Sequence, residues 1–120
     1  MRYFFRKHQR VVRRDDFTRA LHHGACAADG TLVLFAFQTS PDQQAKLGVT
    51  IPKKTGNAVV RNRWKRLIRE SFRTQQDEIP AGYEYVIRPK KGAEPVWTEI
   101  KNSVPGLARK AVARAAKSEA

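Results

Sequence analysis

The stretch from Gly56 to Arg73, GNAVVRNRWKRLIRESFR, constrains the fold more than any other part of the chain. When its residues are placed on a helix, they separate into an apolar stripe and a cationic face. The apolar stripe consists of Val60, Trp64, Leu67, Ile68 and Ser71. The cationic side holds Asn62, Lys65, Arg66, Arg69 and Arg73, and its borders with the stripe hold Arg61 and Arg63. Such a helix must bury one face on a sheet and leave the other exposed.

The charge of this helix indicates a polyanionic partner. It has six Lys/Arg residues and one acid, Glu70, and it lacks the Glu–Lys pairs of an ordinary solvated face. The helix has five arginines and one lysine. Because a guanidinium group is planar and can donate two hydrogen bonds to one phosphate, this composition favours phosphate binding and stacking on bases. The whole chain carries a formal charge of +13, which repels itself unless a polyanion screens it. A merely solvated face and a membrane-surface helix are the weaker alternatives, since the apolar stripe is needed for the core.

The residues before this helix predict an anion site. Lys53 and Lys54 precede Gly56 and Asn57, and asparagine is a favourable N-cap. Backbone N–H groups at a helix N-terminus attract anions, and two lysines beside them strengthen that attraction. The same residues also suit a plain turn, and the two interpretations are compatible.

The rest of the chain predicts a small α+β layer fold in one domain, residues 1–120, with a core of about 11–107 and a basic tail, 108–120. A short helix is expected over 15–22, and strands over 31–37, 45–51 and 83–88. A last helical pattern is formed by Trp97, Ile100, Val104 and Leu107, with Pro105 as a possible kink.

Two of these strands predict a second functional surface. Leu47, Val49 and Ile51 alternate toward a core that Leu32, Leu34 and Ala36 can share. The opposite face then carries Val33, Phe35 and Phe37 beside Lys46, Gly48 and Thr50. Aromatic rings with small and basic neighbours can stack unpaired bases. Periodicity alone is equally consistent with a second interpretation, in which Phe35 and Phe37 are packed under a helix.

Several kinds of chemistry lack residues to support them. No cluster has metal-ligand spacing, and Asp15 and Asp16 suit helix capping better than metal binding. No phosphate-binding glycine loop and no nucleophile with a base at an interpretable spacing is present. We therefore expect neither a catalytic residue nor a metal site on the protein. The single cysteine, Cys26, cannot form an internal disulfide, fits the cytosol, and is expected to be a small buried residue. No window approaches transmembrane length.

The sequence KKTGNAVVRNRWKRLIRESFR resembles the signature of the bacterial ribonuclease P protein component. That pattern reads K-K-x-G-N-A-V-x-R-N-R-x-K-R-x-x-R-x-x-F, and every fixed position is met from Lys53 to Phe72. The flanking segments RRDDFTRALHHG, TLVLFAF, KLGVTI and GYEYVIRP also resemble the family, so that the likeness runs from about Val11 to Leu107.

The resemblance implies a fold. It is a two-layer αβββαβα sandwich with a central four-stranded sheet and a left-handed βαβ crossover, as in domain IV of elongation factor G. A left-handed crossover is an exception to the usual rule. The strand that periodicity does not reveal would lie near Cys26–Ala28.

The resemblance also implies a function. The protein would join a large catalytic RNA in the cytoplasm, one protein to one RNA, and together they would remove the 5′ leader from precursor tRNA. The RNA would hold the catalytic Mg²⁺ ions, while the protein binds the leader and helps metal binding. No membrane is involved.

Together, the residues and the resemblance define two candidate sites. The RNA-binding set comprises Lys53, Lys54, Asn57, Arg61, Asn62, Arg63, Lys65, Arg66, Arg69 and Arg73. The leader-binding cleft comprises Phe17, Leu21, Val33, Phe35, Phe37 and Thr50, with Lys53 at its end. Three positions depart from the family pattern: Leu21 replaces an aromatic, Pro52 a common serine, and Trp64 a smaller Val or Ile. The competing functions are a structural, ribosomal-type RNA-binding protein and a duplex-DNA binder with this helix in the major groove.

Overall fold

The computed structural model describes residues 24–119. The helix expected over 15–22, with Phe17 and Leu21, lies outside that range. Within it, the elements follow the order β1 (Ala25–Ala28), β2 (Leu32–Gln38), β3 (Lys46–Val49), the 3₁₀ turn η2 (Lys53–Thr55), α2 (Ala58–Thr74), the 3₁₀ turn η3 (Gln76–Glu78), β4 (Tyr83–Pro89) and α3 (Trp97–Glu119). The strand implied only by the resemblance, near Cys26–Ala28, is confirmed as β1.

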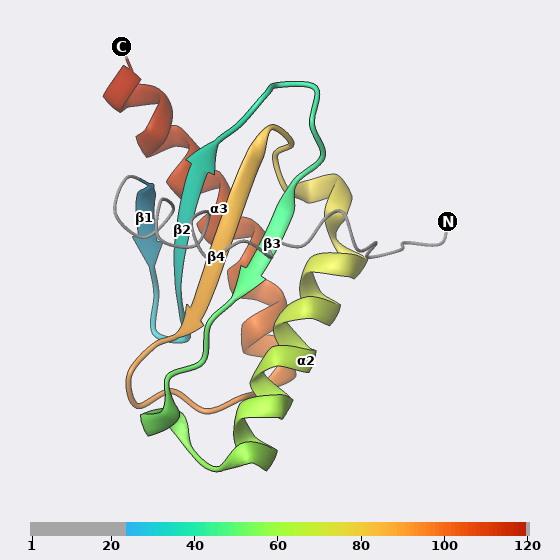
Figure 1. Ribbon diagram of the computed structural model, residues 1–120, viewed down its shortest axis with the longest axis vertical. Helices are drawn as coiled ribbons and strands as arrows, with labels where there is room; N and C mark the ends of the chain where they lie inside the picture. Colours follow the sequence, from blue (N-terminus) through green and yellow to red (C-terminus); the bar gives the residue numbers. More distant parts are fainter. Residues whose placement is uncertain (1–23, 120) are drawn as a thin grey trace.

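The four strands form one sheet in the order β1-β2-β4-β3. β2 pairs antiparallel with both β1 and β4, whereas β3 pairs parallel with β4. The chain therefore crosses from β3 through α2 to the parallel neighbour β4. In Figure 1 both strands run downward, β4 lies to the left of β3, and the helices lie behind the sheet, which makes the crossover left-handed. The α+β fold that the sequence predicted is confirmed.

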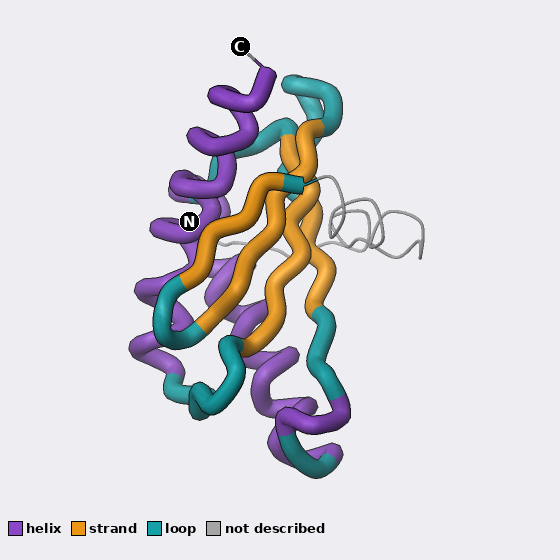
Figure 2. The backbone as a smooth tube through the Cα atoms, turned by 90° about the vertical axis from the view of Figure 1, so that its left-hand side faces the viewer, coloured by secondary structure: helices purple, strands orange, loops and turns teal. Residues whose placement is uncertain are grey.

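The core lies between the sheet and the two α-helices of the described range, which occupy one side of the strands (Figure 2). Alternate residues of each strand face it, as period-two alternation predicts. Leu32, Leu34 and Ala36 from β2 are buried with Leu47 from β3, and Val49 and Ile51 pack against them. From β4, Tyr85 and Ile87 join the same cluster.

The helix α2 forms where the sequence placed it. The side-chain oxygen of Asn57 accepts a hydrogen bond from the N–H of Val60 at 3.0 Å, which caps the first turn. Trp64, Ile68, Ser71 and Phe72 are buried. The Phe72 ring lies 6.4 Å from the Tyr85 ring, centroid to centroid, which fixes α2 on the core face of β4. Its cationic side is thereby turned away from the sheet.

The helix α3 continues through Pro105 without interruption. Proline has no N–H, so the carbonyl of Lys101 loses its partner within the helix. The side-chain amide of Gln75, at the end of α2, donates to that carbonyl at 2.9 Å. Ala108 and Ala111 are buried against the sheet, which extends the core one turn beyond the limit at 107 that the sequence suggested. Small alanine side chains allow the helix to approach the sheet closely. Hydrophobic periodicity gives little weight to alanine and therefore did not predict this contact.

Cys26 corrects one expectation. It is a free, exposed thiol rather than a buried residue. The strand β1 lies at the edge of the sheet, and Ala27 takes its core-facing position at 1 % exposure. Because side chains alternate along a strand, Cys26 points to the other face, where it lies opposite Phe35 of β2.

Candidate nucleic-acid interface

The outer face of α2 presents a group of cations. Asn62, Arg63, Arg66 and Arg69 are exposed, while Arg61 and Lys65 are half-buried. In the part of the chain that the structure describes, no carboxylate lies within ion-pair distance of Arg61, Arg63, Lys65 or Arg66. Positive groups held close together without internal counter-charges attract an external polyanion. We call Arg61, Asn62, Arg63, Lys65, Arg66 and Arg69 the α2 cationic face.

Arg73 differs from Arg61, Arg63, Lys65 and Arg66, which have no carboxylate partner in the described range. Its guanidinium forms an ion pair with Glu70, one turn earlier on the helix. The hydrogen bond from Arg73 holds the pKa of Glu70 below its ordinary value. Arg73 is thus partly neutralised within the helix, and it has less charge to offer a partner than Arg66.

Arg61 carries a donor that lacks an acceptor. Its Nε atom is buried and has no hydrogen-bond partner within the described range. A buried donor left unpaired costs about 1–3 kcal/mol. An oxygen from a bound molecule would remove that cost, and the anionic oxygens of phosphate are among the strongest acceptors available.

The turn before α2 adds two further cations. Lys53 and Lys54 lie exposed in η2, directly before the positive end of the α2 dipole. Asn57 is exposed but uses its side-chain oxygen as the helix cap. The predicted turn and the predicted anion site therefore occupy the same residues, and the role of Asn57 there is to cap the helix.

The predicted leader surface lies on the side of the sheet opposite α2 and α3 (Figure 2). The Phe35 and Phe37 rings are half-buried there, whereas Val33 is only 8 % exposed and offers little area. The cross-strand neighbour of Phe35 in β4 is Val86, and that of Val33 is Arg88. Thr50 is half-buried, and its N–H donates to the carbonyl of Ile87 at 3.1 Å, which continues the β3–β4 pairing.

Sequence reasoning missed Arg88 on this surface. Its guanidinium lies 5.4 Å from the centre of the Phe35 ring, within the range of a cation–π contact. The alternation of β4 could have placed Arg88 on the face opposite Tyr85 and Ile87. The contact between Arg88 and Phe35 also depends on the register between β2 and β4, which the sequence alone does not predict.

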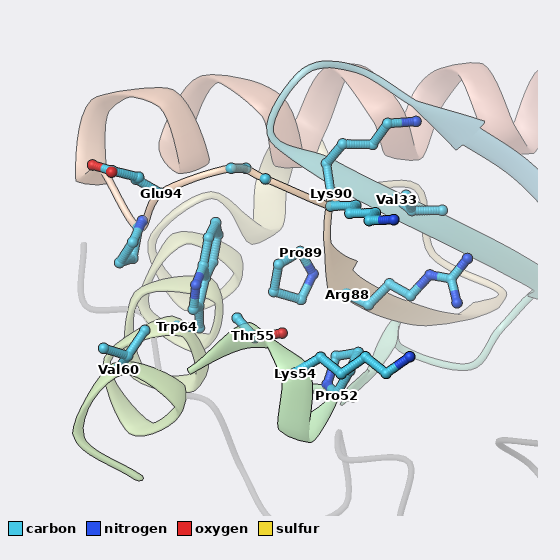
Figure 3. Close-up of a pocket in the computed structure, with 14 residues that line it drawn as sticks. Val33, Pro52, Lys54, Thr55, Val60, Trp64, Arg88, Pro89, Lys90 and Glu94 are labelled. Carbon is cyan, nitrogen blue, oxygen red and sulfur yellow. The ribbon is translucent and has the colours of Figure 1, made fainter. Parts of the chain in front are cut away.

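A groove of about 820 Å³, also missed by sequence reasoning, lies beside these surfaces (Figure 3). One wall comes from η2 and the first turns of α2, and the other from the end of β4 and the loop that follows it. Its lining residues are Val33, Pro52, Lys54, Thr55, Val60, Trp64, Arg88, Pro89, Lys90, Lys91, Gly92, Ala93, Glu94 and Pro95. Four of them are cations and one is an acid, so the groove is basic at its rim and apolar along its walls.

The described range contains no group of three or more His, Cys, Asp or Glu residues that could hold a metal ion. None of the helices found within that range has the length and apolar character needed to cross a membrane.

Comparisons with known proteins identify the family of this chain. A model of the family described as Ribonuclease P matches residues 5–112. Ribonuclease P protein components from Bacillus cereus (strain Q1) and Bacillus anthracis (strain CDC 684 / NRRL 3495) are each 35 % identical over 100 residues, which is 82 % of this chain and 87 % and 84 % of those proteins.

Solved structures give the same result. The Staphylococcus aureus RNase P protein aligns with a TM-score of 0.75 at 29 % identity, covering 86 % of this chain and 94 % of that one. The Thermotoga maritima RNase P protein aligns with a TM-score of 0.71 at 27 % identity, covering 83 % and 96 %. The chain, with its signature carried on η2 and α2 and its four-stranded sheet, therefore belongs to the ribonuclease P protein family.

Proposed function

We propose that this protein is the RNA-binding subunit of a ribonuclease P holoenzyme that removes the 5′ leader from precursor tRNA. The observation that carries the proposal is the α2 cationic face. This face lies within the segment that matches the complete family signature. Its arginines Arg63 and Arg66 have no carboxylate partner in the described range.

In this proposal α2 holds the catalytic RNA. Guanidinium groups bind phosphate oxygens in a forked geometry, and their charge makes assembly strongly dependent on salt. The lysines of η2 continue the same positive surface around the N-terminus of α2. We propose one protein per catalytic RNA, acting in the cytoplasm.

The leader would lie on the sheet face opposite the helices. Phe35 and Phe37 provide ring surface for stacking single-stranded bases, each stacked base contributing about 1–3 kcal/mol. Arg88 sits over the Phe35 ring, where it supplies positive charge close to that surface. Lys53, past the end of β3, would meet the leader phosphates.

The chemistry of cleavage would belong to the RNA. Phosphodiester hydrolysis requires an activated water and stabilisation of charge on the phosphate, which bound Mg²⁺ ions supply. We propose that the catalytic RNA holds these ions and that the protein raises their effective binding by screening nearby phosphates. The basic side chains of α2 grip RNA in this scheme and transfer no proton.

Reconstitution tests the proposal. The protein, a bacterial ribonuclease P RNA, and both together are incubated with precursor tRNA at low Mg²⁺, and release of the leader is followed on a gel. We expect cleavage only when both are present and none from the protein alone. Cleavage by the protein without RNA would overturn the division of labour. If the protein binds the RNA yet adds nothing to cleavage, a structural, ribosomal-type role is favoured.

A further inference from the structure

A second unpaired donor lies in a residue that lines the groove beside α2, the indole Nε1 of Trp64. Trp64 is 0 % exposed, and this nitrogen has no acceptor within the described range. Tryptophan N–H groups usually find a partner when buried, and leaving one without a partner costs about 1–3 kcal/mol. Trp64 lies in the groove wall near Val60 and Thr55 (Figure 3).

The remaining lining specifies the chemistry of an occupant. The walls contain apolar surface from Val60, Pro89 and Pro95, and the lining also includes Lys54, Lys90 and Lys91, whose ammonium groups carry positive charge. A planar ring with oxygen or nitrogen acceptors, attached to a phosphate, matches apolar walls, a buried donor and a cationic rim. A nucleotide has these parts, and the groove volume lies within the usual range of ligand sites, about 300–1,000 Å³.

We propose that this groove takes one unpaired nucleotide of the catalytic RNA, with an acceptor on the base facing the Trp64 N–H and the phosphate on the lysine rim. Bases that protrude from loops and bulges are the parts of RNA that proteins most often read individually. The inference deepens the proposed function and rests on it.

Val33 and Arg88 of the leader surface line the groove together with Val60 and Trp64 of α2. We assign the groove to the catalytic RNA because its unpaired donor and the hydrogen bond at its wall both come from α2. Arg63 belongs to the α2 cationic face, and its Nε donates to the carbonyl of Pro95 at 3.4 Å, at the wall of the groove. The groove is therefore continuous with the surface proposed to hold the catalytic RNA. Its base-reading donor, Trp64, also comes from α2 itself.

The bound base would reach the indole only after a small movement of the wall, because Nε1 is closed to water. The β4–α3 loop contains Gly92 with φ 84°, and a Cβ added at this position would meet no atom within 4 Å. We therefore expect Trp64 to change its surroundings when the nucleotide binds.

Tryptophan fluorescence tests this directly. The chain has two tryptophans, and Trp97 does not line the groove. The full-length W97F variant leaves Trp64 as the only indole. Its emission is recorded while catalytic RNA, precursor tRNA or mature tRNA is added separately, and assembly is followed in parallel by gel shift. We expect the Trp64 emission to change with catalytic RNA over the same concentrations as assembly, and to stay constant with either tRNA.

A matched pair of variants measures the contribution of the donor. W64F removes the N–H while keeping an aromatic ring, and W97F is its control outside the groove. We expect W64F to weaken assembly by about three- to tenfold and W97F to leave it unchanged. If W64F does not fold, the emission experiment decides alone, since it uses the native Trp64.

Three results would overturn the inference. A response to precursor tRNA without one to catalytic RNA would assign the groove to the leader. Normal assembly with no change in Trp64 emission would leave the groove empty while the proposed function stands. Failure of the wild-type protein to bind catalytic RNA at all would instead remove the proposed function, and this inference with it.

Discussion

Asp29 joins the β1–β2 turn to α3 through one carboxylate. Its Oδ1 accepts hydrogen bonds from the N–H groups of Thr31 and Leu32 at 2.8 and 2.9 Å. Burial raises the pKa of Asp29, but hydrogen bonds from Ser103, Leu32 and Thr31, with the charge of Lys110, together hold it below its ordinary value. The turn that begins β2 is thus fixed to the helix that covers its core face.

This carboxylate gives a prediction for acid stability. In the unfolded chain the Asp29 pKa returns to about 3.9, above its folded value. The folded state therefore gains stability above that pH and loses it as the pH falls through the folded pKa. We expect D29N to be less stable than wild type by about 1 kcal/mol at pH 7, and the gap in unfolding free energy to narrow in acid. Urea unfolding at pH 7, 5, 4 and 3 measures it. A gap that stays constant over this range would contradict the assigned role.

Phe35 gives a prediction for the leader surface. F35A removes the ring beneath Arg88, whereas F35L keeps apolar volume on the strand but loses the flat face. We expect F35A to weaken binding of precursor tRNA by the holoenzyme about fivefold or more, and to affect mature tRNA much less.

Comparison of the two variants separates stacking from packing. If stacking is the cause, F35L should resemble F35A in precursor binding while keeping near-wild-type thermal stability. Equal losses for precursor and mature tRNA would assign Phe35 to packing of the sheet.

Single residues also mark the limit of what the sequence could predict. The N-cap at Asn57 and the buried stripe of Trp64 and Ile68 follow from local spacing, and the structure confirms them. The contact of Arg88 with Phe35 depends on strand register, and the exposure of Cys26 depends on β1 lying at an edge. Local periodicity predicts neither the contact nor the exposure.

At the scale of elements, α2 and α3 are joined by a hydrogen bond that compensates for a proline. Gln75 donates to the Lys101 carbonyl, which Pro105 leaves without its helical donor, and the same amide nitrogen lies 2.9 Å from the buried Ser71 hydroxyl. The link sets how α2, with its cationic face, lies against α3.

A double-mutant cycle tests this link. We expect Q75L to destabilise the protein by about 1–2 kcal/mol, because the Lys101 carbonyl loses its partner. In a P105A background the alanine at position 105 restores the N–H, and Q75L should then cost less, with a coupling of about 0.5–1.5 kcal/mol. Unfolding in urea gives the four free energies. A cost of Q75L that is the same in both backgrounds would show that Gln75 does not replace the missing donor.

The helices were predicted with unequal success for a physical reason. The apolar stripe of α2 is long and regular, so its bounds were predicted to within two residues. The pattern of α3 was interrupted by Pro105 and ended in alanines, which hydrophobic periodicity underweights. Only the packing of Ala108 and Ala111 on the sheet shows that the helix continues the core.

At the scale of the whole molecule, the topology could not be derived from periodicity. The left-handed crossover runs against the usual rule, and only the family resemblance predicted it. The strand order β1-β2-β4-β3 was predicted neither by periodicity nor by the resemblance. The groove also arises from tertiary structure, because its walls come from separate segments of the chain, as with Val60 and Pro95.

The topology separates two surfaces of one small domain. The α2 cationic face lies on the helical layer, and the Phe35 surface lies on the opposite face of the sheet (Figure 2). A domain built this way can hold a large RNA on one side and a single strand on the other. In the proposed function, the formal charge of +13 would serve assembly rather than folding, because bound RNA would neutralise the repulsion between its like charges.

The salt dependence of assembly tests the central claim, that the α2 cationic face grips RNA phosphates, most directly. Affinity for the catalytic RNA is measured against salt for wild type, R66A and, as a matched control on α3, K101A; Arg66 and Lys101 are both exposed. Each lost phosphate contact lowers the slope of log affinity against log salt by about 0.7–0.9. We predict that R66A weakens binding and flattens the slope by about this amount, while K101A leaves both unchanged. An unchanged slope for R66A, or an equal change for K101A, would contradict the account.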